Sequence, residues 1–270
     1  MDYTPMLNTA MRAAREAGML LRELSGKPEY QQWKGAREIV VGSVFPIQDK
    51  IIELLRADFP NDAILAEESD TPPDRESDPL WIVDPVDGSI NFHQGIPHAA
   101  ISIAYRAEGV YQVGVVYDPF RDEMFQALRG RSARLNDQPI VVQQVSEGED
   151  AYFRAIVGAD LPGDQATRLQ ALNMVTLMAS QCTGLTLMGS PALGLCYVAA
   201  GRLHGYFALN LELWDVAAAS VILSESGGIL TDIRGCSWLH PTGGYMASNG
   251  VIHGWMMRNV QSVFWKERKE

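Results

Sequence analysis

The chain has 270 residues, of which 47% are hydrophobic and 20% are charged, as in a globular protein of one large domain or two halves that share a core. This composition excludes a collagen, a disordered tail and a disulfide-stapled miniprotein. The 33 acidic and 22 basic residues give a formal net charge of −11. We therefore expect no nucleic-acid partner, because such a partner requires a basic face.

Three cysteines at wide spacings fit neither a disulfide framework nor a zinc site. The N-terminus lacks the pattern of a signal peptide, and no apolar run reaches the ~18 residues that a membrane span requires. We expect a cytoplasmic protein with no membrane partner.

Hydrophobic periodicity in the first part of the chain predicts two helices and then a strand. The helices are expected at residues 4–24, with proline in the first turn and glycine beyond the end, and at 43–58. Residues 63–66 (AILA) then predict a short buried strand that leads directly into Glu67 and Glu68.

A polar, proline-rich surface loop is predicted at residues 70–79. Four strands follow at 80–83, 99–106, 112–117 and 123–128, and the last three are typical of an antiparallel meander.

Strands and helices alternate in the rest of the chain, which favours an α/β arrangement. The strands are expected at 152–158, 186–189, 204–208, 228–232 and 245–248, and the helices at 168–180, 190–201 and 214–226. We predict a single unit over 1–270, with an α+β half over 1–141 and an α/β half over 142–270.

The passage WIVDPVDGSINF, residues 81–92, carries the most chemical information. A predicted strand ends at Asp84, and the chain then turns to Asp87 and to the Gly88-Ser89 step. Oxygen ligands grouped at a strand end suit Mg²⁺, and N–H groups at a Gly-Ser step suit a phosphate. Because Asp-Pro and Asp-Gly also form ordinary turns, this passage alone fits a plain turn equally well.

Two further acidic segments lie at predicted element ends. Glu67 closes the strand before Asp84, so two adjacent strands that end together would bring both carboxylates to one sheet edge. Asp215, in WDVAA, lies at the start of a predicted helix. Taken singly, a Glu-Glu pair is more often a solvated face and such an aspartate is more often a helix N-cap.

The order of these motifs resembles the inositol monophosphatase family of Mg²⁺-dependent, Li⁺-sensitive phosphatases. The matching segments are E-E-S, W-I-V-D-P-V-D-G-S-I-N-F, G-S-P-A-L and W-D-V-A-A, and the likeness covers nearly the whole chain. The resemblance implies a layered αβαβα sandwich of the sugar-phosphatase type, with a metal cluster at the junction of the two halves. It also implies a homodimer.

For the metal site, the resemblance implies two or more Mg²⁺ ions. Glu67, Asp84 and the carbonyl of Val86 would hold one ion, and Asp84, Asp87 and Asp215 would hold a second. Bridging by Asp84 would place the ions about 3.5–4 Å apart, as two-metal hydrolysis requires.

For the substrate, the resemblance implies that Gly88 and Ser89 receive the phosphate and that the Ser89 hydroxyl orients the attacking water. Gly189 and Ser190 would approach substrate hydroxyls, and Asp215 would also face the substrate. The implied reaction is hydrolysis of a phosphate monoester of a small polyol or sugar, similar to inositol-1-phosphate, by two-metal activation of water.

The chain departs from the family at several positions. The family pattern V-T-x-x-D-x-x-x-E, aligned without a gap, places Val41, Val44 and Gln48 at its three polar positions. Asp49 lies about 140° round the helix from Val44, so it cannot replace the missing carboxylate. The glutamate that recognises inositol in the family falls on Ala208.

These departures leave two functions open. The first is a working phosphatase, because Glu67, Asp84, Asp87, Ser89 and Asp215 are all present. The alternative is a protein of the family fold with weak or no catalysis, acting as a binding or regulatory partner. A phosphatase for histidinol phosphate, fructose-1,6-bisphosphate or 3′-phosphoadenosine nucleotides is also open, since loss of a hydroxyl acceptor changes specificity strongly.

Overall fold

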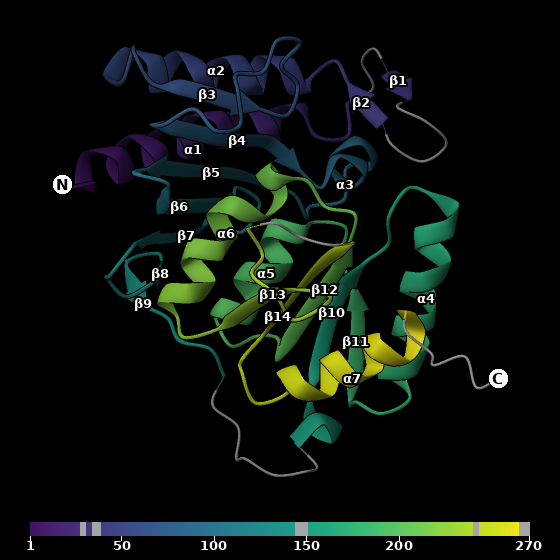
Figure 1. The fold of residues 1–270 in the computed structure, drawn as a ribbon. Helices are drawn as coiled ribbons and strands as arrows, with labels where there is room; N and C mark the ends of the chain where they lie inside the picture. The colour runs from purple at the N-terminus through teal and green to yellow at the C-terminus, as the bar shows by residue number, and fades with distance from the viewer. Residues whose placement is uncertain (28–30, 34–38, 144–150, 240–242, 265–270) are drawn as a thin grey trace.

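Pairs of helices and sheets alternate through the molecule in five layers (Figure 1). In order, the layers are two helices, a seven-stranded sheet, two helices, a five-stranded sheet and two helices. The αβαβα sandwich that the family resemblance implies is therefore confirmed. This computed structural model describes residues 1–27, 31–33, 39–143, 151–239 and 243–264.

The first layer consists of α1 (Thr4–Leu24) and α2 (Val44–Asp58), close to the two ranges predicted from periodicity. Helix α1 turns a stripe of small and apolar residues toward the first sheet. The buried stripe consists of Thr9, Ala10, Ala13, Ala14, Ala17, Gly18 and Leu21. A separate antiparallel pair, β1 (Gln31–Trp33) and β2 (Ile39–Val41), precedes α2.

The seven-stranded sheet follows the chain order from β3 to β9. Its strands are β3 (Ala63–Ala66), β4 (Leu80–Asp87), β5 (Ala100–Ala107), β6 (Val110–Asp118), β7 (Glu123–Leu128), β8 (Arg134–Leu135) and β9 (Gln138–Pro139). The first two strands are parallel, with Ala66 opposite Val83, and the remaining pairs are antiparallel. The predicted meander is therefore confirmed, and β4 extends beyond its predicted end to Asp87 with a register shift against β5.

The middle layer, α5 (Pro191–Ala199) and α6 (Leu213–Glu225), packs between the two sheets. One hydrophobic cluster joins side chains of both sheets through this layer, including Ile82 of the first sheet and Tyr206 of the second. The two sheets therefore share a core. The division into halves at residue 141 stays a prediction.

The five-stranded sheet has the order β11-β10-β12-β14-β13. Its strands are β10 (Ile156–Asp160), β11 (Gly184–Leu187), β12 (Gly205–Leu209), β13 (Ile229–Asp232) and β14 (Gly244–Ser248). The first three strands in this order are parallel, and the last two pairings are antiparallel.

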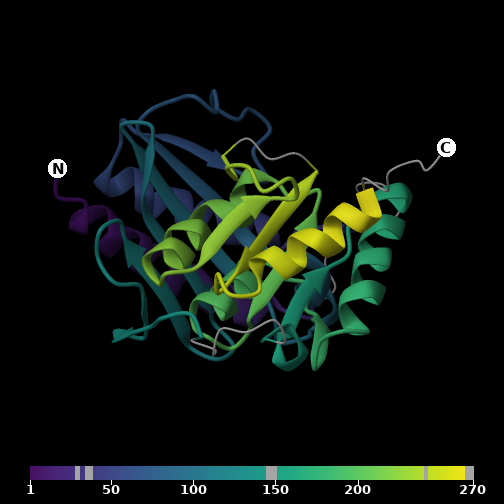
Figure 2. The ribbon, with the colours of Figure 1, turned by 60° about the horizontal axis from the view of Figure 1, so that its bottom comes forward.

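The outer layer consists of α4 (Gln165–Ala179) and α7 (His253–Phe264), which lie side by side (Figures 1 and 2). Helix α7 was not predicted. The strand predicted from residue 152 is wrong at its start, because Ala151–Arg154 form a 3-10 helix. The ring of Tyr152 stacks on Trp255 of α7, with centroids 5.3 Å apart, so these residues pack against the helix instead of joining the sheet.

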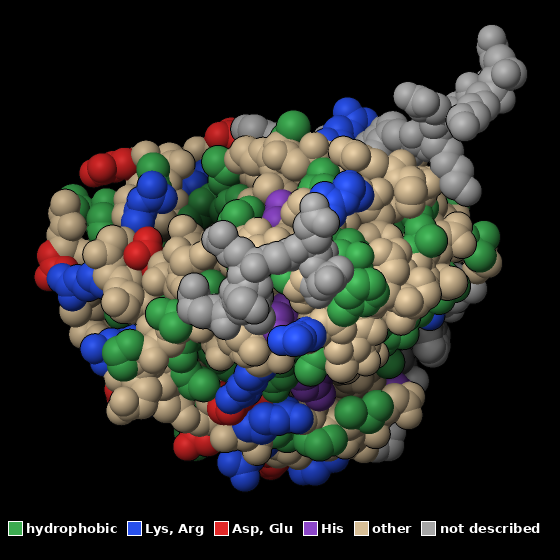
Figure 3. Space-filling view, turned by 90° about the horizontal axis from the view of Figure 1, so that it is seen from below, with side chains coloured by type: hydrophobic (Ala, Val, Ile, Leu, Met, Phe, Trp, Pro, Cys, Tyr) green, Lys and Arg blue, Asp and Glu red, His purple; other side chains and the backbone are tan. Residues whose placement is uncertain are grey.

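Several Lys and Arg side chains lie near one another, beside acidic ones, on the face that Figure 3 shows. Among the described residues, no helix combines the length and the apolarity that a membrane crossing requires.

Candidate active site

A cavity of about 350 Å³ opens where strand ends of both sheets meet. Its wall is built from the ends of β3, β4, β10 and β12, the start of α6 and the turns that follow β4 and β11. Of the nine residues that the sequence predicts for the site, only Ser190 is absent from this lining. The structure thus brings together segments that are far apart in the chain.

The parallel pairing of β3 and β4 brings the first two carboxylates to one edge. The backbone N–H of Glu67 donates to the carbonyl of Val83 at 3.2 Å, which continues the ladder by one residue. Glu67 and Asp84 therefore directly follow paired positions of two neighbouring strands, which brings them together as predicted, although β4 does not end with β3 and continues to Asp87.

Three aspartates form the centre of the site. One carboxylate oxygen of each of Asp84, Asp87 and Asp215 lies within 4.8 Å of the others. The first two are buried and the third is partly exposed. Among the described residues, no other group of His, Cys, Asp or Glu is arranged in this way.

Each aspartate of the cluster is oriented by a protein donor. Asp84 Oδ1 accepts the backbone N–H of Val86 at 2.9 Å. Asp87 Oδ2 accepts the hydroxyl of Ser190 and the backbone N–H of Ala192 at 3.1 Å.

Asp215 takes part in the N-terminal capping of α6. Its Oδ2 accepts the backbone N–H of Glu212 at 2.8 Å, and the two residues form a capping box in which Glu212 is the N-cap. Asp215 is therefore the third residue of the helix, not its cap, and its carboxylate lines the cavity.

Burial and mutual repulsion disfavour the charged forms of these carboxylates. Burial raises the pKa of Asp84 well above its ordinary value, and the charges of Glu67, Asp87 and Asp215 add to this effect. Burial likewise raises the pKa of Asp87, and burial raises the pKa of Asp215 to about 8. A multivalent cation would offset this repulsion, and a donor set made only of oxygen fits Mg²⁺.

The turn after β4 requires glycine at Gly88. This residue has φ +98°, and a Cβ placed on it would lie 2.9 Å from the carbonyl oxygen of Gly189 and 3.1 Å from that of His98. Ser89 begins the short helix α3 (Ser89–Gln94), and its hydroxyl donates to the carbonyl of Val86 at 3.1 Å. The backbone of the Gly-Ser step therefore forms part of the cavity wall.

The residues that replace the family's polar positions do not restore the missing carboxylate. Val44 is buried, and Asp49, on the same helix, is exposed. The Gln48 side chain accepts the backbone N–H of Glu68 at 3.0 Å, so it supports the chain beside Glu67. The side chain of Val41 lies outside the described residues.

The position of the family's substrate-binding glutamate is apolar here. Ala208 is buried and lines the cavity. Glu212 does not replace it, because its carboxylate pairs with Arg75 at 2.9 Å on the other side of the α6 N-terminus.

A further acidic residue in the wall, Asp160, was missed in the sequence. It ends β10, just as Asp87 ends β4 and Glu67 follows β3, and this position was the available signal. Its pKa is raised by burial, and its charge contributes to the raised pKa of Asp87.

The family model of the inositol monophosphatase family matches residues 2–264, so the chain belongs to that family. Nus factor SuhB of Pasteurella multocida is 39% identical over 270 residues, which cover 98% of this chain and 99% of that protein. The crystal structure of extragenic suppressor protein suhB from Bartonella henselae has a TM-score of 0.88 at 30% identity, covering 96% of this chain and 99% of that one. The structure of an IMPase from Thermotoga maritima has a TM-score of 0.86 at 29% identity, and the match covers 96% of this chain and 98% of that one.

Proposed function

We propose that the protein is an Mg²⁺-dependent phosphate monoester hydrolase that acts on a small phosphorylated polyol or sugar. The observation that carries this proposal is the cluster of three carboxylates within 4.8 Å, in a cavity that also contains the Gly88-Ser89 turn. Membership of a phosphatase family and the likeness to an IMPase structure support it.

In this proposal, Glu67, Asp84, Asp87, Asp215 and the carbonyl of Val86 hold two or more Mg²⁺ ions. When bound, the ions neutralise the phosphate charge and activate water. The carboxylates supply the negative charge and the fixed oxygen geometry that this arrangement requires.

The neighbouring turns of the chain bind and orient the substrate. The backbone N–H groups of Gly88 and Ser89 bind the phosphate, and the Ser89 hydroxyl orients the attacking water. Gly189 lies beside them in the wall, where a small residue leaves room for substrate hydroxyls. Ser190 is buried behind Asp87, so we assign it an indirect part in binding through that carboxylate.

The charge of the cavity supports a monophosphate as substrate. None of the described residues in its lining is Lys, Arg or His, whereas a second phosphate group requires cationic partners. The amide of Asn210 lies in the same wall and suits hydroxyl groups.

The test is Mg²⁺-dependent phosphate release from a panel of esters. The panel contains inositol-1-phosphate, sugar monophosphates, histidinol phosphate, fructose-1,6-bisphosphate and a 3′-phosphoadenosine nucleotide. We expect turnover of a polyol or sugar monophosphate at the highest kcat/KM. Absence of turnover across the panel, with folded protein and ample Mg²⁺, would contradict the proposal.

A second candidate is a binding or regulatory function of the same fold with little catalysis. It is favoured by the names of relatives, since the Pasteurella protein is called a Nus factor. The apolar Val44 and Ala208 at two family carboxylate positions also favour it.

Restoring one carboxylate distinguishes the two candidates. Under the second candidate, Val44→Asp should make phosphate release appear or rise greatly, because it restores one of the two missing carboxylates. Under the first, the wild type already turns over, and Val44→Asp changes mainly the Mg²⁺ or Li⁺ response. Val44→Leu is the control for disturbed packing at this buried position.

We also propose that the protein is a cytoplasmic homodimer, as the family resemblance implies. The three cysteines Cys182, Cys196 and Cys236 are free thiols, which suits a reducing compartment. Light scattering should give a mass near twice 29.8 kDa, and a mass near 29.8 kDa would contradict the dimer.

A further inference from the structure

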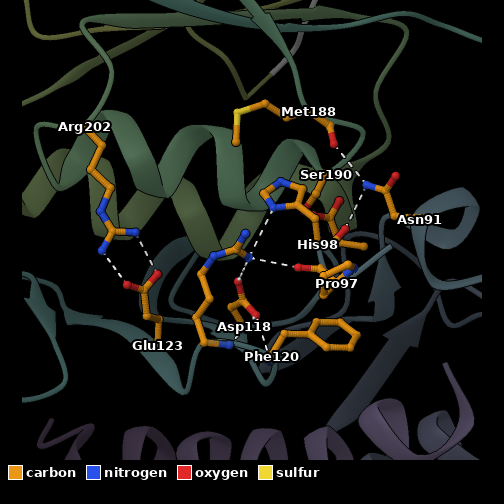
Figure 4. A network of polar contacts seen from close by, with 11 residues as sticks. Asn91, Pro97, His98, Asp118, Phe120, Glu123, Met188, Ser190 and Arg202 are labelled. Atoms are coloured by element: carbon orange, nitrogen blue, oxygen red, sulfur yellow. Dashed lines mark hydrogen bonds and ion pairs between the residues drawn. The ribbon is translucent and has the colours of Figure 1, made fainter. Parts of the chain in front are cut away.

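The turn formed by Met188 and Gly189, between β11 and α5, is held by side chains from two separate parts of the fold. Asp160 Oδ1 accepts the backbone N–H of Met188 at 3.0 Å and that of Gly189 at 2.5 Å. On the other side, Asn91 Nδ2 donates to the carbonyl of Met188 at 3.0 Å (Figure 4) and to that of Gly189 at 3.3 Å. Both polar groups of both residues are therefore bound.

This turn determines where the next residues meet the acidic cluster. Ser190 is the N-cap residue of α5, is fully buried and donates its hydroxyl to Asp87. The backbone N–H of Ala192 donates to the same carboxylate oxygen. The orientation of the Asp87 carboxylate thus depends on the position of the α5 N-terminus.

Asp160 uses both carboxylate oxygens on protein donors. Besides the two amides on Oδ1, Oδ2 accepts the hydroxyl of Tyr206 at 2.6 Å. Asp160 lies on β10 opposite Ala208 of β12, and it is not one of the three aspartates that lie within 4.8 Å of one another. Its contacts are those of an anchor for the turn and not of a metal ligand.

Gly189 shows how closely the turn is fitted. It has φ +73°, and a Cβ placed on it would lie 2.9 Å from Asn91 Nδ2. Any side chain at this position would displace the Asn91 amide, which holds the turn from helix α3.

We propose that Asp160 is a positioning residue for Asp87, acting through the Met188-Gly189 turn and Ser190. This inference rests on the proposed function in one respect, that Asp87 holds a divalent cation. Asp160 fixes the turn from the second sheet, Asn91 fixes it from helix α3, and the fixed turn presents two hydrogen-bond donors to the Asp87 carboxylate.

The test compares Asp160→Ala with Asp160→Asn in the full chain. The asparagine keeps an oxygen acceptor for the two amides but removes the charge, whereas alanine removes both. Asp164→Ala is the matched control, because it removes a carboxylate on the same β10–α4 connection that accepts Thr167 N–H at 2.9 Å and does not contact the turn.

The primary measurement is Mn²⁺ binding to each variant, followed by the loss of the free Mn²⁺ signal in electron paramagnetic resonance. Loss of a residue that orients a metal ligand typically weakens binding about 10- to 100-fold. We expect Asp160→Ala to weaken Mn²⁺ binding by an amount in that range and to raise the Mg²⁺ concentration for half-maximal activity by a matching factor. For Asp160→Asn and Asp164→Ala, we expect Mn²⁺ affinity to change within about threefold. Amide exchange at Met188 and Gly189 should accelerate in Asp160→Ala.

Two results would overturn the proposal. One is Mn²⁺ binding by Asp160→Ala as tight as by Asp164→Ala. The other is equal impairment of Asp160→Asn and Asp160→Ala, since charge and not the hydrogen-bonded turn would then be responsible. If Asp160→Ala does not fold, Mn²⁺ binding and amide exchange are measured on Asp160→Asn and Asn91→Ala instead. Asn91→Ala releases the turn from the other side, and these two variants then decide the question. Because metal binding is measured without a substrate, a failure of the proposed hydrolase activity is distinguishable from a failure of this inference.

Discussion

At the scale of single residues, the acidic cluster lowers the stability of the metal-free protein, because it brings several carboxylates close together. Three aspartates lie close together in the wall of the cavity, and burial and their mutual repulsion raise their pKa values. Such an arrangement is useful only when a cation is bound, so function and the stability of the metal-free protein should oppose each other here.

Replacing Asp84 tests this opposition. Asp84→Asn keeps an oxygen that can accept the Val86 N–H but removes one buried charge. We expect the metal-free variant to gain about 1 kcal/mol in free energy of unfolding and to lose Mg²⁺-dependent turnover. Urea denaturation in a chelator and a phosphate-release assay measure the two effects. The exposed Asp49→Asn is the control, and a less stable Asp84→Asn would contradict the prediction.

The pKa of Asp215 predicts a pH dependence of stability in the metal-free protein. A carboxyl whose pKa is about 8 when folded, against an ordinary value of 3.8, is protonated in the folded state over that window but charged in the unfolded state. Its stabilising contribution is therefore complete below pH 3.8 and is lost as the pH rises through 8. The free energy of unfolding, measured in a chelator, should fall between about pH 4 and pH 8 and level off above that. Asp215→Asn should reduce this fall, and an equal fall in the variant would refute the assignment.

The sequence identifies most residues of the site because each lies in a motif at the end of a predicted element. It misses Asp160, since no motif surrounds it and only the pairing of β10 with β12 brings it to the cavity. The interaction of Ser190 with Asp87 also depends on tertiary contact and cannot be deduced from spacing.

At the scale of elements, the approach of α6 to β6 depends on one glycine. A Cβ on Gly114 would lie 2.1 Å from the carbonyl oxygen of Ala218, so the helix could not remain at its present distance. The start of α6 carries Asp215, and the packing of this helix therefore also places part of the site.

We expect Gly114→Ala to destabilise the protein by about 2 kcal/mol or more, because overpacking forces the backbone to move. Gly184→Ala is the matched control, since it lies in a strand with no atom within 4 Å of the added Cβ. Urea denaturation measures both variants. Equal urea midpoints for Gly114→Ala and Gly184→Ala would contradict the prediction, because α6 would then accommodate the added methyl group without loss of stability.

Element positions follow from the sequence where one face is buried, as in α1 and the meander. The predictions are less accurate where tertiary contacts decide the structure. Tyr152 belongs to a segment with strand-like composition, yet it packs on Trp255, and the helix that carries Trp255 was itself not predicted. The buried residues of this helix, α7, do follow helical spacing, and they are Trp255, Met256, Asn259 and Val260.

At the scale of the whole molecule, the site joins both sheets, so a bound cation should stabilise the complete fold and not one half. Saturating Mg²⁺ at about 100 times its dissociation constant would add about 2.7 kcal/mol. Calorimetry should show one unfolding transition that moves to higher temperature with Mg²⁺ in the wild type. Asp87→Asn should abolish most of this shift, and an undiminished shift would place the cation elsewhere.

The wide separation of the cavity residues along the chain has a consequence for protein synthesis. Asp84 and Asp87 leave the ribosome well before Asp160, Gly189 and Asp215, at rates of about 5–20 residues per second. For a period on the order of ten seconds, the nascent chain therefore carries the first two aspartates without the strands and helix that enclose them. The newly made protein acquires its acidic pocket only near the end of translation, so a chain that terminates before residue 215 cannot assemble the cluster of three aspartates.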